Sequence, residues 1–361
     1  MPPFTGSYAL DEVQFLLKPL CVQDTPVHIK EALIQSGKKH YSQMLSHESL
    51  PADEYVSLFY DAMALNQERV AEQVLILAKQ IIETRPKGIT LVSLARAGTP
   101  VGVLLKHVLK QYFHTDIQHY SVSIIRDMGL DLNALRFILQ HHSPDSLVFV
   151  DGWTGKGVIA RQLATSLSEF AESDGVTIPA ELYVLTDLSG SAAVAASCED
   201  YLIPSSVLNS TVSGLVSRSV YDPHTMEAGD FHGCVYYQHF AEQDLSAYFI
   251  ETILACVDRV WCRGKFERPT IDRQGLQNIS QTLLQWLAEH YAVSHSNYIK
   301  PGIGEATRVL LRREAQHLLL RDLNAEATRH LRWLAESKSI PVAVIPELPY
   351  QAVALIKELQ L

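Results

Sequence analysis

In LVFVDGWTGKGVIA (147–160), an apolar run passes through a loop of small residues into a helical pattern. Residues 147–150 are all apolar, which is typical of a strand that is buried on both faces of a sheet. Asp151 follows this strand, and a helix is expected over 157–172. In an open parallel sheet, ligands bind outside the carboxyl ends of the strands, where such loops lie. The stretch therefore predicts an α/β domain with a ligand site after this strand.

The flanking sequence repeats the same alternation of strand and helix. Strands are expected at 88–95, 119–125, 146–151 and 181–187, with helices at 101–113, 132–142 and 157–172 between them. Strands that alternate with helices of this length indicate βαβ units, and hence a parallel sheet flanked by helices. Residues 11–84 are predicted to be helical, most clearly over 61–83, where apolar residues recur at helical spacing without Gly or Pro.

The remainder of the chain predicts a second, smaller domain. Residues 201–223 are rich in Ser, Thr and Asn and suit either a polar loop or an N-capped helix start. A connecting helix is expected over 270–290. A new αβ pattern then has helices at 301–314, 325–339 and 349–359, and strands at 315–322 and 340–348. We predict two domains: 1–275, comprising N-terminal helices, a hood and a core at 85–220, and 293–361.

Composition excludes several classes of protein. The chain has 361 residues, 47% of them hydrophobic, and a net charge of −10, which is ordinary for globular proteins and disfavours non-specific nucleic-acid binding. Five scattered cysteines without CxxC spacing favour a reducing compartment. There is no signal peptide pattern and no apolar run of about 20 residues. We expect a cytoplasmic protein without a membrane partner.

The loop after residue 150 predicts an anion site. Backbone N–H groups of residues 154–157 and the positive end of the following helix would suit one phosphate. Asp151 is placed to bind a ribose hydroxyl or a Mg²⁺-bound oxygen. A Walker A loop is excluded because Gly152 and Gly155 have the wrong spacing. The alternative is a glycine-rich turn that binds nothing.

These residues resemble the type I phosphoribosyltransferases, whose fingerprint is four apolar residues, two acids and a Thr-Gly phosphate loop. Asp151 matches the first acid, whereas Gly152 replaces the second. SLARAGTPVG (93–102) resembles the family's pyrophosphate loop, and HYSVSIIRDMGLD (119–131) its mobile loop. The resemblance implies the catalytic residues Arg96, Asp151 and Arg126. It also implies the phosphoribosyl pyrophosphate-binding residues Ala97, Gly98, Thr99, Gly152, Thr154, Gly155, Lys156 and Gly157.

Motifs along nearly the whole chain, among them GSYALDEVQFLLK, LNSTVSGLVSRSVY and KPGIGEATRVLLRR, resemble the phosphoribosyltransferases of tellurite-resistance stress clusters. Related sequences also carry the label cysteine protease StiP. The resemblance implies the substrate-hood residues His40, Ser42, Asn209, Ser210, Thr211, Ser213 and Arg218. Each of these also suits a helix cap or a polar surface position.

The tail resembles the Pelota-type RNA-binding fold. PGIGEATR (301–308) resembles that fold's Gly-x-Asn-Glu-x-Thr-Lys turn, with Gly in place of the Asn that reads bases. The resemblance implies an RNA contact through Gly302, Gly304, Glu305, Thr307 and Arg308. Arg308, Arg312 and Arg313 form a small basic patch that could bind phosphates or could be a solvated helix face.

Together these patterns predict a phosphoribosyltransferase. Its partners would be phosphoribosyl pyrophosphate and an unidentified nitrogenous base, with Mg²⁺ bound through the former, and a nucleotide or nucleoside-like metabolite would form as pyrophosphate leaves. A homodimer and bound RNA are further expectations, and no metal site made by the protein alone is proposed. The alternatives are a ligand-sensing RNA-binding regulator and a cysteine protease using Cys234, which has His232 and His239 nearby in the sequence.

Overall fold

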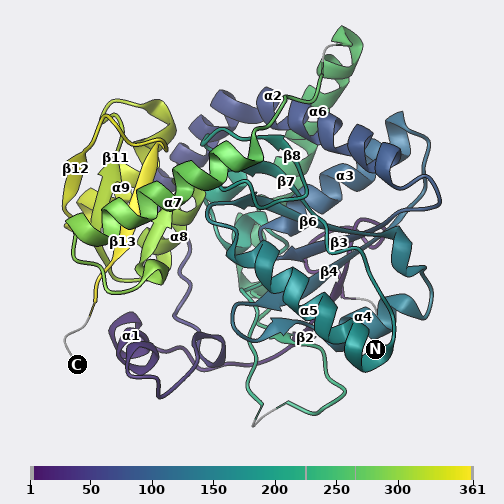
Figure 1. Ribbon diagram of the computed structural model, residues 1–361, viewed down its shortest axis with the longest axis horizontal. Helices are drawn as coiled ribbons and strands as arrows, with labels where there is room; N and C mark the ends of the chain where they lie inside the picture. Colours follow the sequence, from purple (N-terminus) through teal and green to yellow (C-terminus); the bar gives the residue numbers. More distant parts are fainter. Residues whose placement is uncertain (1–3, 224–225, 265, 359–361) are drawn as a thin grey trace.

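The main domain is built on a twisted, mostly parallel sheet. The computed structural model describes residues 4–223, 226–264 and 266–358 (Figure 1). Strands of the main sheet follow the order β1-β4-β3-β6-β7-β8, all neighbours in this order parallel, and β5 pairs antiparallel with β4. The strands are β1 (Gln14–Leu16), β3 (Thr90–Ala95), β4 (Gln118–Ile125), β5 (Gly129–Leu130), β6 (Leu147–Thr154), β7 (Leu182–Asp187) and β8 (Val194–Ser197).

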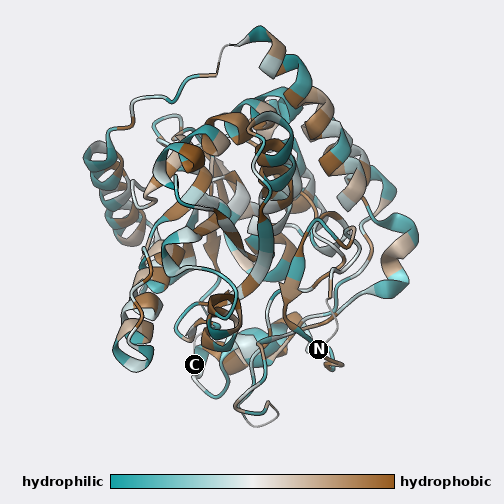
Figure 2. Ribbon diagram, turned by 90° about the vertical axis from the view of Figure 1, so that its right-hand side faces the viewer, coloured by the Kyte–Doolittle hydropathy of each residue, from teal (hydrophilic) through white to brown (hydrophobic). Residues whose placement is uncertain are grey.

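Helices cover both faces of this sheet, as the apolar strands require. One face packs against α2 (Asp53–Thr84), α3 (Gly98–Tyr112) and α6 (Ser246–Arg263), and the other against α4 (Leu132–Leu139) and α5 (Val158–Asp174). Neighbouring residues of one strand serve opposite faces, so Leu91 joins the core under α3 while Val92 joins the core under α5. The helices carry hydrophobic and hydrophilic residues in turn (Figure 2). The four predicted strands and the helices between them are confirmed.

The N-terminal prediction of helix over residues 11–84 is wrong for its first part. The segment instead contains β1, β2 (Lys18–Pro19), α1 (Val27–Gln35) and a short turn at Tyr41–Gln43 before α2 begins at Asp53. Three prolines between residues 19 and 51 interrupt any longer helix. The apolar run of β1 is stabilised by pairing with β4, and β2 pairs with β9 (Gly233–Cys234), so distant strands decide the local conformation.

The C-terminal domain has a four-stranded sheet in the order β10-β13-β11-β12. Its elements are α7 (Arg273–His290), β10 (Ile299–Pro301), α8 (Ile303–Arg312), β11 (Ala315–Leu320), α9 (Arg329–Ser337), β12 (Val342–Val344) and β13 (Ala352–Ile356). The predicted helix over 349–359 is wrong, because β13 lies between β10 and β11 with all five residues buried. A short apolar run is compatible with either structure, and here the partners on both sides select the strand.

The predicted fold class is confirmed: an α/β domain with a parallel sheet flanked by helices, followed by a smaller αβ domain. The second domain lies at the carboxyl edge of the main sheet, where the Cβ position of Gly304 in α8 comes within 2.4 Å of the Trp153 ring in β6. No helix in the described part of the chain combines the length and apolarity needed to cross a bilayer. The division at residues 275 and 293 stays a prediction.

Candidate functional site

A cleft lies between the carboxyl edge of the main sheet and helix α8 of the C-terminal domain. It consists of three adjoining pockets of about 240, 250 and 220 Å³. Asp151 and Arg308 line both the second and the third pocket, while Arg96 and Arg312 line both the third and the first. Clefts at strand ends and between domains are the usual places for small ligands.

The cleft is strongly positive although the chain is acidic. Its lining contains nine Lys or Arg residues and three carboxylates, whereas the whole chain has a net charge of −10. The cations are Lys30, Arg96, Arg126, Lys156, Arg218, Lys300, Arg308, Arg312 and Arg313, and the acids are Glu48, Asp151 and Glu305. A concave site with one sign of charge concentrates ligands of the opposite sign. The arrangement therefore favours an anion.

The loop after β6 is covered by the C-terminal domain. Lys156 Nζ donates to the Ile299 carbonyl at 3.0 Å and also to the Ser296 carbonyl. A Cβ at Gly155 would lie 2.7 Å from the Pro301 carbonyl oxygen, so the two backbones approach too closely for any side chain there. Gly157, in the left-handed region at φ 72°, donates its N–H to Thr154 Oγ1 at 3.0 Å. Its amide is thus already occupied within the loop.

Two carboxylates in this part of the cleft have shifted pKa values. Burial raises the pKa of Asp151 to about 6, against the opposing effect of Arg308, and its Oδ1 accepts the Gly152 N–H at 2.7 Å. Burial also acts to raise the pKa of Glu305, but Arg308 and the nearby lysines outweigh it, so the pKa lies below its usual value. Glu305 therefore stays charged, and it accepts from Arg308 Nη1 at 2.6 Å.

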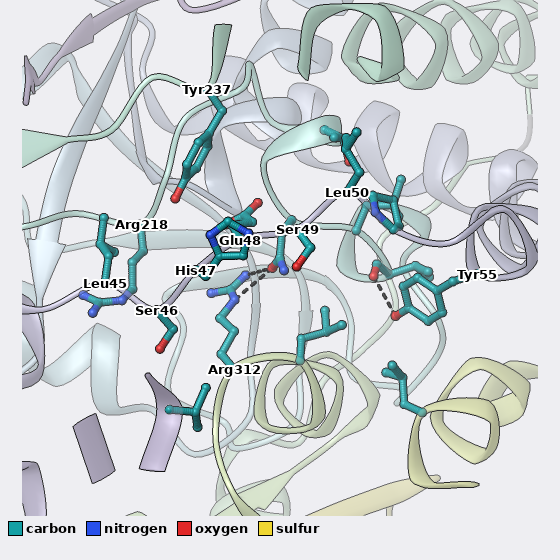
Figure 3. A pocket seen from close by; sticks show the side chains of 18 of the residues that line it. Leu45, Ser46, His47, Glu48, Ser49, Leu50, Tyr55, Arg218, Tyr237 and Arg312 are labelled. Carbon is teal, nitrogen blue, oxygen red and sulfur yellow. Dashed lines mark hydrogen bonds between the residues drawn. The ribbon is translucent and has the colours of Figure 1, made fainter. Parts of the chain in front are cut away.

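Two guanidinium groups converge on one amide oxygen in the first pocket. Figure 3 shows this pocket, with Arg312 among the residues that line it. Asn209 Oδ1 accepts from Arg96 Nη2 at 2.7 Å and from Arg312 Nε at 2.8 Å. Arg96 also donates to the Val216 carbonyl at 3.1 Å and lies 3.3 Å from Glu48. Glu48 in turn accepts the Ser210 N–H at 2.7 Å. One carboxylate thus opposes two buried arginines, and this leaves excess positive charge.

Tyr41 lies between two further arginines. The guanidinium carbons of Arg126 and Arg218 are each 5.3 Å from the centre of its ring, within the range of cation–π attraction. Arg218 donates to the Tyr41 carbonyl at 2.6 Å and also to the Met44 carbonyl. Burial lowers the pKa of Arg218 to about 10, so it remains charged at neutral pH.

The three lysines of the cleft have depressed pKa values. Burial, followed by the charge of Lys300, lowers the pKa of Lys156 to about 7. Burial is also the main cause for Lys30 and Lys300, whose pKa values fall to about 8. Burial and, to a smaller extent, the neighbouring cations work against the charged lysines, and a bound anion would offset both effects.

The structure places only part of the predicted transferase site in the cleft. Arg96, Ala97, Arg126, Asp151, Thr154, Gly155 and Lys156 line it. Gly98, Thr99, Gly152 and Gly157 are not among the lining residues of the described chain. Gly98 packs where a Cβ would meet the Val150 carbonyl oxygen at 2.4 Å, and Thr99 Oγ1 contacts Ser121 Oγ at 2.7 Å. These residues support the loops.

Four of the seven predicted hood residues line the cleft, and three do not. Asn209, Thr211, Ser213 and Arg218 line the cleft. His40 and Ser42 instead hold each other at 2.8 Å between His40 Nδ1 and Ser42 Oγ, and Ser42 donates to the Tyr221 carbonyl at 3.1 Å. The backbone N–H of Ser210 donates a hydrogen bond to Glu48. The last three therefore position the segment rather than face the cavity.

Most of the residues predicted to contact RNA face the main domain. Arg308 lies 4.3 Å from the centre of the Trp153 ring, and Glu305 and Arg308 line the cleft. A Cβ at Gly302 would meet the Leu188 side chain at 2.6 Å. Thr307 is buried within its own domain, donating to the Ile303 carbonyl and contacting His330 Nε2, both at 2.8 Å. RNA binding through this turn stays a prediction.

The cleft residues that sequence reasoning missed include Lys30, Tyr41, Glu48, Trp153 and Lys300. Tyr41 lies between the predicted residues His40 and Ser42, and Trp153 lies inside the predicted loop. The sequence motifs could therefore have identified both residues. Lys30, Glu48 and Lys300 have no local signal, because distant segments bring them to the cleft.

Burial works against activation of three of the five cysteine thiols. Burial raises the pKa of Cys234 to about 12, and it also raises the pKa of Cys198 and Cys256. Cys21 and Cys262 are exposed. Among the described residues, no hydrogen bond joins a cysteine to a histidine, and His232 contacts Ser123 Oγ at 2.8 Å rather than Cys234. A nucleophilic cysteine needs a lowered pKa and a neighbouring base.

Comparison with known proteins gives two family matches and one curated relative. The family described as tellurite-like stress resistance cysteine protease StiP matches residues 6–254, and the PELOTA RNA binding domain matches residues 278–358. A protein of Acinetobacter baylyi named cysteine protease StiP is 42% identical over 99% of this chain and 95% of its own length.

Solved structures are similar at a lower level. A hypoxanthine phosphoribosyltransferase from Trypanosoma cruzi, in complex with the product IMP, is 17% identical and covers 50% of this chain and 93% of its own, with a TM-score of 0.27. A hypothetical protein from Neisseria gonorrhoeae with bound ppGpp is 14% identical over 33% of this chain and 66% of its own, with a TM-score of 0.22. Such likenesses carry no argument about function.

The prediction of a phosphoribosyltransferase is wrong by this comparison. The relative that matches nearly the full length is named a cysteine protease, and similarity to transferases is confined to distant structures. The sequence motif is a loop of small residues after a parallel strand, which several functions can use, so the loop alone does not identify a reaction. The tellurite and stress-resistance likeness and the match to a Pelota domain are confirmed.

Proposed function

The chain belongs to the family described as tellurite-like stress resistance cysteine protease StiP, and we propose that its cleft binds a small ligand carrying phosphate groups. The observation that supports this most directly is the charge of the cleft, nine cations against three carboxylates in a chain of net charge −10. Holding more cations than carboxylates in a partly buried cleft costs free energy, which a bound anion would offset.

The chemistry of the cations suits phosphate. Six of the nine are arginines, whose planar guanidinium groups bind phosphate oxygens in pairs. They come from both domains: Arg96, Arg126 and Arg218 from the first, and Arg308, Arg312 and Arg313 from α8 and its end. A ligand with two separated anionic groups could reach both sets. Phosphoribosyl pyrophosphate, a nitrogenous base, Mg²⁺ and RNA remain predictions as partners.

The direct test is calorimetric titration of the full chain with pyrophosphate, using Arg126→Ala as the variant. Arg126 lines the cleft, and its ion-pair partner Asp127 is exposed, so the change leaves no buried charge unpaired. Loss of a charge-assisted hydrogen bond of about 1.5–3 kcal/mol predicts roughly a tenfold or greater loss of affinity.

The matched control is Arg329→Ala, which removes an exposed ion pair with Asp61, away from the residues that line the cleft. It should bind pyrophosphate as the unmodified chain does. The absence of measurable binding to the unmodified chain, or equal affinities for the two variants, would show that the positive charge serves another purpose.

Cysteine proteolysis is the second candidate, favoured by the name of the nearly full-length relative. The test is cleavage of a denatured protein substrate by the full chain, with and without iodoacetamide, followed by five single Cys→Ser variants. Loss of cleavage in one variant alone would identify the nucleophile. Cleavage that persists in all five, or none by the unmodified chain, would exclude it. Cys234→Ser is expected to have no effect on chemistry, because burial keeps that thiol protonated.

A further inference from the structure

The first pocket has an apolar half beside its arginines. Five of its 22 lining residues are charged, against seven of 13 in the second pocket. Six of the uncharged ones form a surface of aliphatic and aromatic side chains, the apolar wall: Leu50, Tyr55, Val207, Leu311, Trp333 and Leu334. Both domains contribute to this wall, since α2 and the segment before it belong to the first domain, and α8 and α9 to the second. A ligand in this pocket would therefore contact hydrocarbon as well as cations.

Contacts within the apolar wall hold it in place. The Tyr55 hydroxyl donates to the Val207 carbonyl at 2.8 Å, and the centre of the Tyr55 ring lies 5.2 Å from that of Trp333. Tyr55, Val207 and Leu334 are buried, whereas Leu50 is 39% exposed. Besides the bonded Tyr55 hydroxyl, the indole N–H of Trp333 is the one polar group that the side chains of these six residues carry. A polar group placed against the wall would thus lose hydrogen bonds to water and gain few in return.

The arginines of this pocket lie directly beside the apolar wall. Leu311 of the wall immediately precedes Arg312 in α8. Figure 3 shows Tyr55 on one side of Arg312 and Arg218 on the other. Arg96 completes the group, because it and Arg312 donate to the same amide oxygen. A phosphate bound by these guanidinium groups would leave the rest of its ligand within reach of the wall.

We propose that the ligand of the cleft is a phosphate monoester of an apolar alcohol or phenol, with its phosphate at the arginines and its hydrocarbon or ring against the apolar wall. This inference rests on the proposed function, since the phosphate is what anchors the ligand. The first pocket has a volume of about 240 Å³. An engineered apolar cavity of about 150 Å³ holds benzene, so a ring fits beside the phosphate. Binding would also remove the exposed part of Leu50 from water, which is favourable.

The test compares phenyl phosphate with methyl phosphate by calorimetric titration of the full chain at about pH 8, where both esters are dianions. Because the two esters carry the same charge, the ratio of their affinities measures the contribution of the apolar group. Burial of the ring should make phenyl phosphate bind about 10- to 100-fold more tightly than methyl phosphate. Excess pyrophosphate should displace it. Equal affinities for the two esters, or phenyl phosphate that pyrophosphate does not displace, would overturn the proposal.

Two variants locate the apolar contact. Leu50→Ser and Trp333→Leu each remove part of the apolar wall, and each should lower the ratio of the two affinities several-fold. Leu50 is partly exposed, so its replacement should disturb folding least. The matched control is Leu323→Ser, at an exposed leucine outside the lining of the three pockets, and it should keep the ratio. A ratio that stays the same in both wall variants would place the apolar group elsewhere and refute the proposal.

Pyrophosphate separates this inference from the proposed function. If pyrophosphate binds to the unmodified chain while phenyl phosphate binds no better than methyl phosphate, the apolar part of the site is refuted alone. If none of the three anions binds, the anion site is refuted as well.

Discussion

At the scale of single residues, the cleft is positively charged although the chain as a whole is acidic. Its cations come from positions as distant as Lys30 and Arg313, and only the stretch 308–313 supplies three of them together. Each arginine is held by backbone carbonyls, amides or a carboxylate, as Arg96 is by Asn209 and Glu48. The protein therefore fixes positive groups in place before any ligand arrives, which lowers the ordering cost of binding.

Gly304 lies at a close contact between the two domains. A Cβ at this position would lie 2.4 Å from the Trp153 ring, which is itself buried and covered by Arg308. Gly304→Ala should therefore destabilise the chain by about 1–3 kcal/mol through overpacking. Denaturant unfolding measures the change. Gly229→Ala is the matched control, because nothing lies within 4 Å of its Cβ position and its φ is unrestricted. Equal stability of the two variants would mean that the domains separate freely at this contact.

Lys156 makes anion binding depend on pH. Its pKa is lowered to about 7, and those of Lys30 and Lys300 to about 8, so these lysines lose their protons between about pH 6 and pH 9. An anion favours the charged lysines and takes protons up when it binds. Affinity should consequently rise as pH falls, by up to about tenfold per pH unit for each proton taken up, and level off only below the pKa of Asp151 at about 6, because protonation of that carboxylate also removes negative charge from the cleft.

Sulfate is the probe for this prediction because its own charge is constant over that range. Titrations at several pH values give the slope, and calorimetry in two buffers of different ionisation enthalpy gives the proton uptake. Lys156→Arg, whose guanidinium stays charged, should flatten the slope near pH 7. A slope of zero in the unmodified chain would contradict the titrating role of these lysines.

At the scale of elements, helix α8 joins the two halves of the molecule. Its first N–H group, from Ile303, donates to Asp200 Oδ1 at 2.9 Å, and Asp200 Oδ2 accepts the Gln351 N–H at 2.7 Å. At its other end, Arg313 Nη2 pairs with the buried Glu31 Oε2 at 2.7 Å. Both ends are thus held by carboxylates of the main domain, which orients the arginines between them toward the cleft.

Removing the carboxylate at the start of α8 should loosen this attachment. Asp200→Ala leaves the Ile303 and Gln351 N–H groups without an acceptor, at about 1–3 kcal/mol for each buried group. We expect a lower unfolding free energy and weaker pyrophosphate binding together, since α8 supplies part of the cleft. Asp145→Ala, an exposed position, should change neither. Loss of stability with unchanged affinity would show that α8 keeps its place without Asp200.

How far the sequence predicts these elements depends on how local their causes are. Strand β6 and helix α5 were predictable because a continuous apolar run, a loop of small residues and a helical pattern follow one another within 28 residues. Strand β13 was predicted as a helix because AVALI suits both structures, and its neighbours β10 and β11 come from elsewhere in the chain. The same holds for the site: Asp151 and Lys156 lie in a motif, whereas Lys300 and Glu48 are brought by the packing of distant segments.

At the scale of the whole molecule, the cleft exists only where the two domains meet. The loop after β6 and the start of α8 approach within van der Waals distance. Lys156 of this loop also donates hydrogen bonds to carbonyl groups of the C-terminal domain. No property of either segment alone reveals the contact, because about 150 residues separate them. Function assigned to one domain by its motif is therefore incomplete without the other.

Hydrogen exchange can test whether a bound ligand contacts both domains. Because the lining comes from both domains, pyrophosphate should slow exchange at the β6–α5 loop, residues 154–158, and equally at residues 299–308 of β10 and α8. At 100 times its Kd, a ligand of the joined state adds about 2.7 kcal/mol to stability, so protection at both places should be of similar size. The far side of the main sheet, for example α4, serves as the internal control and should not change. Protection confined to one domain would mean that the ligand site lies within that domain, and that the contact between them is structural alone.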